Sequence, residues 1–383
     1  MNWINNFLLG LLSAAFAYCL LVFGDWYIKK NLTQQLDSNP EYLRATKIVD
    51  MRKKNEDVPL KSVAYEQGFT PGVFPALMDR LNFDYPLIAG VPNTNVVLCN
   101  EGYGLIKYRT DRFGFRNNDR DWDSKSKSIM IGDSFVHGAC VNSNQTLTSV
   151  VATNTNHIVL NLGTGSNGPS HYLAYGELFI PKIRPKNVYL IFYANDNGIK
   201  NPSLLEKVYV DEQRKLFSNT GLQLFDTEFF IREGYRAIDI VRKEDLNAEN
   251  KIKKNLFSRV RDNFLSHYNL PMIKRLILPS SANFKQTKKA ISSAFNLCDT
   301  FECNLKVVYI PNSKFWSPDS RADQYGDNII EFANTLNIHA IDGRDILDRT
   351  EGSKDYAIKG LHLSPVGYKK LATSIASAYI IND

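Results

Sequence analysis

Three residue types that could together perform nucleophilic catalysis lie far apart in this sequence. Ser134 follows a short apolar run in the stretch SIMIGDSFVHGACV, and His362 lies in GLHLSPVGY. A serine hydroxyl is a weak nucleophile until a base takes its proton, and imidazole suits that task near neutral pH. Asn195, in FYANDN, could donate an amide N–H to the oxyanion that forms when serine attacks an ester. If the fold brings the three together, the expected chemistry is acyl transfer through an acyl-serine.

A glycine-rich stretch, NLGTGSNGPS, could complete the oxyanion-binding site. The backbone N–H groups of Ser134 and of the turn at Gly165 or Ser166 would supply the remaining donors. Each feature alone has an ordinary explanation, because Gly-Asp-Ser after a strand, a glycine run and Asn-Asp pairs all form turns. A histidine before a helix can likewise be part of a cap. Their joint occurrence, each after a strand or before a helix, favours a catalytic site.

Five apolar runs are predicted to be the strands that position these residues. They span 128–131, 157–162, 187–193, 305–310 and, more weakly, 339–341. Continuous apolar runs are typical of parallel strands that are buried on both faces. Helix-like segments alternate with them, and the last begins with Ser364 as a plausible N-cap. The pattern predicts a doubly wound α/β sheet, which binds ligands beyond the carboxyl ends of its strands.

These blocks resemble those of the SGNH/GDSL hydrolases, a family of serine esterases and acyltransferases. The resemblance covers about 126–383, apart from an insertion at about 200–285, and it implies a flavodoxin-like α/β/α sandwich of about five strands. It implies Ser134 as nucleophile, Gly165 or Ser166 as an oxyanion donor, Asn195 with Asp196 as the third block, and His362 as the base. We also expect Asp133 and Asp196 to lie at the substrate. The segment YRTDRFGFRN, 108–117, resembles one in membrane-linked bacterial members tied to cell-surface polysaccharide.

The sequence departs from the family pattern at the residue that should orient the histidine. Many members carry an aspartate three residues before it, and Lys359 stands there instead. Asp355, further upstream, is the first substitute, and Asp111 or Asp196 are others. Failing these, a backbone carbonyl would orient His362 in a Ser–His dyad. Because loss of the orienting carboxylate can cost orders of magnitude in rate, this departure bears on activity more than on fold.

The expected function is therefore acyl-ester hydrolysis, with an O-acetylated carbohydrate as the substrate implied by the resemblance. Two alternatives stay open: a carbohydrate O-acyltransferase that uses the same serine, and a catalytically weak scaffold that binds polysaccharide or polysaccharide-biosynthesis partners in a membrane complex. Neither a metal nor an organic cofactor is expected, since none of the six histidines lies in a cluster with ligand-like spacing. The net charge of +6 is too small to indicate nucleic-acid binding.

The N-terminal stretch, 7–24, is uncharged and flanked by aromatic residues, which predicts a single-pass anchor within 1–27. A cleaved signal peptide is the competing interpretation. Lys29 and Lys30 after the stretch favour a cytoplasmic domain by the positive-inside rule, whereas a polysaccharide substrate favours a periplasmic one, which we expect. A membrane-proximal subdomain is predicted at 28–125, with a helix at 41–54 and a hairpin at 95–115. The insertion contains an amphipathic stripe, 252–264, that is either a helix packed on the core or a lid or membrane-surface helix near the active site.

The five cysteines leave the redox state open. Cys19 lies in the predicted anchor, and the other four could form disulfides or remain buried thiols. Cys298 and Cys303 are close in sequence.

Overall fold

The structure is a computed structural model that describes residues 10, 13–27, 63–65, 88–99, 101–104, 106–125, 127–165, 167–198, 217–218, 221–236, 284–314, 321–350, 353–358 and 360–380. The chain divides into two compact units, each of which is described by itself. One comprises Met1–Leu43 and Lys243–Pro279, and the other comprises Arg44–Arg242 and Ser280–Asp383.

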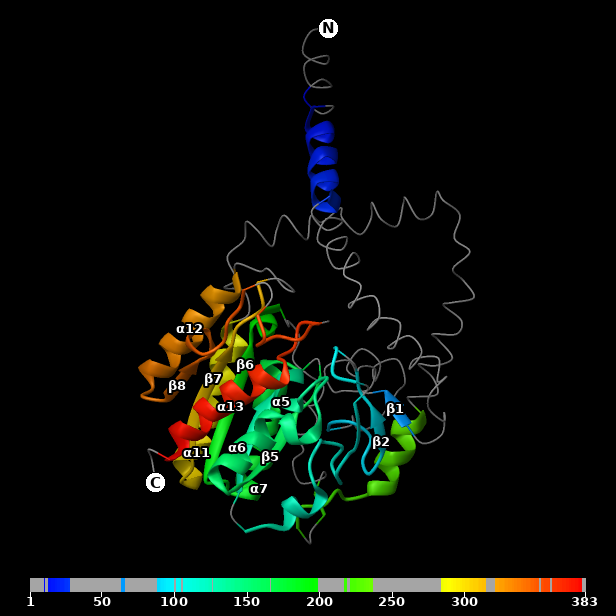
Figure 1. Ribbon diagram of the computed structural model, residues 1–383, viewed down its shortest axis with the longest axis vertical. Coiled ribbons are helices and arrows are strands. Elements are labelled where there is room, and N and C mark those ends of the chain that lie inside the picture. The colour runs from blue at the N-terminus through cyan, green and yellow to red at the C-terminus, as the bar shows by residue number, and fades with distance from the viewer. Residues whose placement is uncertain are drawn as a thin grey trace. The chain divides into compact units, whose positions relative to one another are not determined.

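The larger unit is built on a five-stranded sheet in which every pairing is parallel (Figure 1). Its strands are β4 (Lys127–Gly132), β5 (Ile158–Gly163), β6 (Asn187–Tyr193), β7 (Asn304–Ile310) and β8 (His339–Asp342), in the spatial order β5-β4-β6-β7-β8. The strands agree with the predicted apolar runs to within one residue at each end. The α/β class and the parallel sheet are thus confirmed.

Alternate residues of the strands face two separate apolar layers. On one side, Ile129 and Ile131 pack in a cluster with residues of α7 (Pro169–Ile183), α11 (Phe284–Phe301) and α12 (Arg321–Thr335). On the other side, Met130 packs with residues of α6 (Leu147–Thr155) and α13 (Pro365–Ile380). Burying one such aliphatic side chain contributes roughly 1.5–3 kcal/mol, so both layers stabilise the sheet. The result is a helix–sheet–helix sandwich, visible in Figure 1 with α6 and α13 in front.

The last helix begins where the sequence indicates. The Ser364 hydroxyl accepts the backbone N–H groups of Val366 (3.1 Å) and Gly367 (3.0 Å), which otherwise have no partner in the first turn. Gly367 also lets this turn approach the preceding loop, because a Cβ there would lie 2.0 Å from the carbonyl oxygen of Asp355. This N-cap, two residues after His362, fixes the start of α13 at Pro365.

A second, smaller sheet precedes the sandwich in sequence. β1 (Val63–Tyr65) pairs in parallel with β2 (Asn95–Val97), which pairs antiparallel with β3 (Lys107–Arg109). The β2–β3 hairpin was predicted, and its tip contains Gly102 and Gly104, whose φ values of 110° and 90° favour glycine. Two further backbone hydrogen bonds, between Leu98 and Ile106 and between Ile106 and Cys99, extend the hairpin toward its tip.

Several predicted features fall on other parts of the chain. Within the part that the structure describes, no helix has the length and apolarity needed to cross a bilayer. Residues 7–9, 11 and 12 of the predicted anchor lie outside the described residues, as do the predicted helix at 41–54 and the stripe at 252–264. Of the insertion, the structure describes a helix at 227–236.

Both pairs of cysteines outside the N-terminal stretch form disulfides. Cys99 is bonded to Cys140, and Cys298 to Cys303. Cys19 is a free cysteine. This resolves the alternative that the sequence left open.

Candidate active site

Three of the predicted site residues lie just beyond the carboxyl ends of neighbouring strands. Ser134, Gly165 and Asn195 each follow the end of their strand, β4, β5 and β6 respectively, by two residues. These strands are adjacent in the order β5-β4-β6. The chain leaves β4 in one direction to reach β5 and passes to the other side to form β6, so β4 lies at the topological switch point where such sheets bind ligands.

Ser134 is the first residue of the short helix α5 (Ser134–His137). Asp133 caps that helix, because its carboxylate accepts the backbone N–H of Phe135 at 2.9 Å. The turn is tight, since a Cβ on Gly132 would lie 2.4 Å from a methyl carbon of Val136. The abrupt change from strand to helix therefore holds the Ser134 side chain, which is partly exposed, at the sheet edge.

His362 lies within hydrogen-bonding distance of that serine. The His362 Nε2 atom is 2.9 Å from the Ser134 Oγ atom, across 228 residues of sequence. The imidazole also packs at 5.0 Å from the Phe135 ring, which in turn stacks on Tyr193. The structure thus brings the predicted nucleophile and base together, in a geometry suited to proton transfer between them.

Backbone contacts hold the His362 loop on both sides of the histidine. Tyr356 and Leu363 form an antiparallel bridge, the His362 carbonyl accepts the N–H of Ala357 at 2.8 Å, and the Asp355 carbonyl accepts the N–H of Ser364 at 2.9 Å. The Tyr356 hydroxyl donates to the carbonyl of Pro311, directly after β7, at 2.7 Å. This loop is therefore attached to the sheet and is not a free connection.

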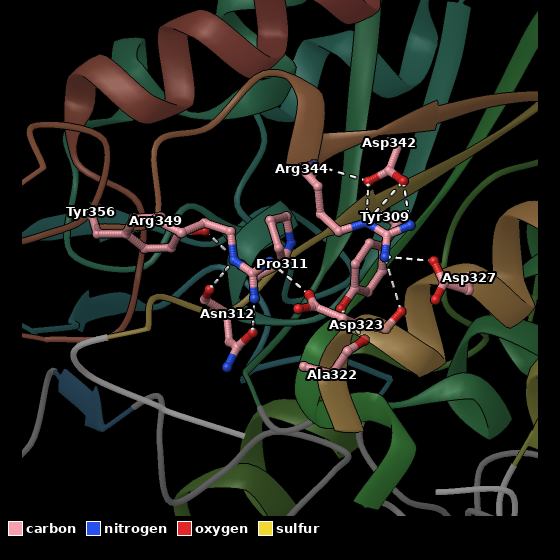
Figure 2. Close-up of polar contacts among 10 residues, drawn as sticks. All are labelled: Tyr309, Pro311, Asn312, Ala322, Asp323, Asp327, Asp342, Arg344, Arg349 and Tyr356. Carbon is pink, nitrogen blue, oxygen red and sulfur yellow. Dashed lines mark hydrogen bonds and ion pairs between the residues drawn. The ribbon is translucent and has the colours of Figure 1, made fainter. Parts of the chain in front are cut away.

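Two arginines reinforce the same edge of the sheet (Figure 2). Arg349 donates to the carbonyl and the side-chain oxygen of Asn312, at 2.9 and 2.8 Å, and to Asp323 at 2.6 Å. Arg344 bonds to Asp342 at the end of β8 and to Asp327 on α12. Because these contacts join the ends of β7, β8 and α12, they fix the surface to which Tyr356 attaches.

The acid beside His362 is Glu101, from the tip of the β2–β3 hairpin. Its Oε1 atom is 2.8 Å from His362 Nδ1, and its Oε2 atom is 3.3 Å from the backbone nitrogen of His362. Both groups are largely buried, with 13% and 11% of the side chains exposed. A Cβ on Gly360 would lie 2.0 Å from Glu101 Cδ, so the glycine leaves room for this contact. A carboxylate there can fix the tautomer in which Nε2 accepts the serine proton.

The acids considered from the sequence have other partners. The Asp355 carboxylate accepts hydrogen bonds from the backbone N–H of Asp348 and from the Lys370 ammonium, both at 2.8 Å. The prediction that Asp355 orients His362 is therefore corrected, because Glu101 occupies that position. Asp196 accepts the Tyr172 hydroxyl and the N–H of Tyr193. Lys359 lies outside the described residues. Asp355 is thus an anchor of the loop, although it is close to His362 in sequence.

Asp111, the remaining alternative, is the centre of the YRTDRFGFRN segment. It accepts hydrogen bonds from the N–H groups of Phe113 and Phe115 and from the side chains of Asn117 and Trp122. Burial, offset in part by these donors, raises its pKa to about 6. Asn117 also pairs with both backbone groups of Asn161 on β5, at 2.7 and 3.0 Å. The segment therefore packs on the sheet, and its aspartate supports structure.

Arg116 from the same segment holds the end of α5. Its guanidinium donates to the carbonyls of Gly138 (2.8 Å) and Val141 (2.9 Å), which follow the helix. Cations are favoured at helix carboxyl ends, where carbonyls lack partners. The arginine consequently supports the turn that carries Ser134 from the end opposite to Asp133.

Of the three residues predicted to donate to an oxyanion besides Ser134, the structure describes two. Gly165 is partly buried at the sheet edge, Asn195 is exposed within the 3-10 helix η3 (Ala194–Gly198), and Ser166 lies outside the described residues. The structure brings Gly165 and Asn195 to the same edge as Ser134 without a hydrogen bond between them. Asp133 and Asp196, expected at the substrate, are both buried and serve as hydrogen-bond acceptors for backbone N–H groups.

The charges around the imidazole favour its protonated form. Burial lowers the pKa of His362, but the charge and hydrogen bond of Glu101 and the charge of Asp133 outweigh it, so the pKa is raised above the usual 6.5. Burial raises the pKa of Asp133 to about 6, against the opposing effects of the Phe135 N–H and His362. Burial, with the charges of Arg116 and His362, holds the pKa of His137 well below its usual value. The imidazolium formed during proton transfer is thus stabilised by two carboxylates.

One group of potential metal ligands includes residues of this site. Ligand atoms of Glu101, Cys140 and His362 lie within 4.8 Å of one another. The sulfur of Cys140 is, however, bonded to Cys99 and is not a thiolate, which is the form that binds metals. The residues present do not fit a metal centre that includes this cysteine.

Comparison with known proteins gives likenesses in structure alone. No family model and no curated protein matches the chain. Similar solved structures include a carbohydrate acetylesterase family member from Sinorhizobium meliloti, at 9% identity and a TM-score of 0.37, over 67% of this chain and 98% of that one. Further examples are a lipase/acylhydrolase from Enterococcus faecalis (12% identity, TM-score 0.37, 66% of this chain and 94% of that one) and a GDSL-like lipase from Bacteroides thetaiotaomicron VPI-5482 (11%, 0.36, 66% and 87%). At these values the likeness concerns the fold and carries no argument about the reaction.

Proposed function

We propose that this protein is a serine acyl-ester hydrolase that acts through an acyl-enzyme. The single observation that carries the proposal is the 2.9 Å contact between Ser134 Oγ and His362 Nε2 at the carboxyl edge of the sheet. A serine in contact with an imidazole can be deprotonated as it attacks, which an isolated serine cannot. In this proposal, residues at the strand ends on either side of Ser134 donate to the oxyanion.

The reaction divides into two acyl transfers. His362 Nε2 accepts the Ser134 proton as Oγ bonds to the ester carbonyl carbon, and the carbonyl oxygen becomes an oxyanion. When the tetrahedral intermediate collapses, the alkoxide leaves with that proton from His362, and Ser134 remains acylated. A water molecule then attacks the acyl-serine while His362 accepts its proton. The carboxylic acid leaves, and the proton returns to Ser134 Oγ.

The oxyanion is bound by donors at three strand ends in this proposal. The Ser134 N–H begins α5, the Gly165 N–H follows β5, and the Asn195 amide follows β6. Asn195 is exposed, which leaves its amide able to turn toward a bound substrate. Loss of one such donor costs about 10²–10³-fold in rate in serine hydrolases. Asn195→Ala is expected to fall in that range.

The substrate we propose is an O-acetylated carbohydrate. Its support is the resemblance of YRTDRFGFRN to members linked to cell-surface polysaccharide. We also propose that the domain lies outside the cytoplasm, because the two disulfides, Cys99–Cys140 and Cys298–Cys303, persist in oxidising compartments. A C-terminal alkaline phosphatase fusion tests this, and a well-expressed but inactive fusion would place the domain in the cytoplasm.

The function is tested by p-nitrophenyl acetate hydrolysis with the full chain in detergent. Ser134→Ala and His362→Ala are each expected to lower kcat to the background of the assay, because nucleophile and base act as one unit. Ser149→Ala, on the partly exposed surface of α6, is the matched control and should keep wild-type kcat. Hydrolysis that survives Ser134→Ala contradicts the mechanism.

The two alternatives give different results in the same experiment. An O-acyltransferase would form the acyl-Ser134 adduct and release it faster when a sugar acceptor is added, which mass spectrometry of the intact protein detects. A binding scaffold would show neither an adduct nor hydrolysis but would retain polysaccharide. Either result would replace the hydrolase proposal.

A further inference from the structure

We propose that Glu101 is the positioning residue for His362 and that the Cys99–Cys140 disulfide holds it in place, so that the enzyme is fully active only when this bond is formed. The inference rests on the proposed function and deepens it. It concerns the same site but assigns a role to the hairpin and to a disulfide outside the sheet.

Glu101 reaches His362 from an element that belongs to another sheet. It lies at the tip of the β2–β3 hairpin, 261 residues before the histidine, whereas Ser134 and His362 are attached to the five-stranded sheet. A histidine base needs its Nδ1 proton fixed so that Nε2 is free to accept from serine. The carboxylate does this at 2.8 Å, and its second oxygen lies 3.3 Å from the backbone nitrogen of the same residue. Two contacts to one residue define the carboxylate position better than one.

The two cysteines of the disulfide enclose the acid and the nucleophile along the chain. Cys99 precedes Glu101 by two residues, and Cys140 follows the end of α5 by three. The bond thus joins the hairpin, close to its tip, directly to the segment that follows the serine helix. Both cysteines are buried, in a small apolar cluster with Leu98, Ile106 and Ala139.

Besides the disulfide, described residues of the hairpin contact α5 at Tyr108. The Tyr108 hydroxyl is 2.8 Å from His137 Nε2, and Tyr108 packs against both the five-residue cluster around the disulfide and the large core that contains Val96 of β2. The five-residue cluster alone buries little apolar surface, so we expect the covalent bond to contribute to the docking of the hairpin tip. Without it, we expect the hairpin to remain folded but its tip to vary in position. A displacement of about 1 Å is enough to disturb a catalytic contact.

Glu101→Gln is the first test, because the amide keeps the shape and removes the charge. We expect kcat to fall by about 10²–10⁴-fold, as when the orienting carboxylate of a serine hydrolase becomes an amide. Glu101→Asp keeps the charge on a shorter side chain and should recover part of the loss. A role confined to packing would not distinguish Gln from Asp in this way.

The pH profile separates positioning from general structural support. The base must be neutral, so the acid limb of kcat/KM follows the pKa of His362, which Glu101 and Asp133 raise while His137 stays neutral. Glu101→Gln removes the larger of the two raising charges, so that pKa falls and the acid limb moves to lower pH. An unchanged limb together with wild-type kcat would overturn the assignment.

The disulfide is tested with a pair of double variants. Cys99→Ala/Cys140→Ala should lower kcat by about tenfold and move the acid limb in the same direction as Glu101→Gln. Cys298→Ala/Cys303→Ala removes the other disulfide and should change neither. Adding Glu101→Gln to the Cys99/Cys140 variant should produce no loss beyond that of Glu101→Gln alone, because the bond acts through the glutamate. If the loss from Glu101→Gln multiplied the loss from the Cys99/Cys140 variant, or if that variant kept full activity, the proposed role of the disulfide would be overturned.

If the Cys99/Cys140 variant does not fold, chemical reduction of the folded enzyme tests the role of the disulfide instead. Dithiothreitol supplies two electrons and two protons, which cleave the bond to two thiols while the reagent closes to its cyclic disulfide. In the Cys298→Ala/Cys303→Ala background only Cys99–Cys140 can react among the described cysteines, and activity should fall while the circular dichroism of the helices is kept. Full activity after complete reduction would contradict the proposal. If Ser134→Ala retains activity, the proposed function itself fails; if it does not, the Glu101 results stand separately.

Discussion

The two ends of the proton-transfer chain are held in different ways. Ser134 and His362 belong to segments bonded to the parallel sheet, through the β4–α5 turn and the Tyr356 and Asp355 contacts. Glu101 belongs to a hairpin outside that sheet, whose described contacts include a disulfide, the Tyr108–His137 contact, a small apolar cluster and a close approach at Gly360. In the proposed site, the sheet positions the nucleophile and the base, and we expect the hairpin to orient the base. Changes at the two regions should therefore differ in their effects.

Among the variants that leave every residue of the proposed site in place, Gly360→Ala is expected to have the largest effect. Gly360→Ala places a Cβ 2.0–2.5 Å from three side-chain atoms of Glu101, so the glutamate must move while its charge remains. We expect kcat to fall by about 10–100-fold with little change in the urea midpoint, because the clash is with a side chain. Gly176→Ala on α7, where the nearest atom is 3.7 Å away, is the control. Equal activity of the two variants would mean that the position of Glu101 does not limit the reaction.

Substitution of Asp111, which accepts four hydrogen bonds, should affect stability more than rate. The Asp111 carboxylate is the acceptor in all four of these hydrogen bonds. In Asp111→Asn, one oxygen is replaced by an NH₂ group, which cannot accept hydrogen bonds from the donors that face it. We expect the free energy of unfolding to fall by about 2–3 kcal/mol in urea titrations, with kcat changed less than about threefold. Asp299→Asn, exposed on α11, should change neither. A loss of rate as large as that of Gly360→Ala would show that Asp111 also positions the site.

The second disulfide gives the smallest effect on rate. Cys298–Cys303 closes a short loop between α11 and β7, on the helix that covers the face of the sheet opposite α13. Its removal is expected to cost about 2 kcal/mol of stability by the loop-entropy relation and to leave kcat unchanged. Thermal unfolding and p-nitrophenyl acetate hydrolysis of the same variant measure both. A rate loss comparable to that of the Cys99/Cys140 variant would erase the distinction between the two bonds.

Much of the sheet was predictable because its strands are locally encoded. The run from Asn187 to Tyr193 is buried at every position, so its apolar pattern marked both ends of β6. Ser364 was recognisable as an N-cap because capping depends on the next three residues. Ser134 and His362 were recognisable because each stands beside such a local signal.

Glu101 could not be found in this way. Its partner lies 261 residues away, and its position depends on how the hairpin docks, which no local pattern encodes. The expectation that an acid three or more residues before the histidine would serve led to Asp355, which instead pairs with Lys370. The available signal was Cys99, because a bond from Cys99 to Cys140 would have placed the hairpin beside the GDS turn.

The wide separation of the contacting residues also bears on the order of folding. The serine and the histidine are 228 residues apart, so we expect their contact to form only after α13 has docked on the five-stranded sheet. Long loops add little to the free-energy cost of closure, but contacts of this kind form late. Recovery of esterase activity during refolding should consequently lag behind recovery of helical circular dichroism. Partly folded chains would show no hydrolysis of p-nitrophenyl acetate, so the rate of hydrolysis would measure the fraction of completely folded protein.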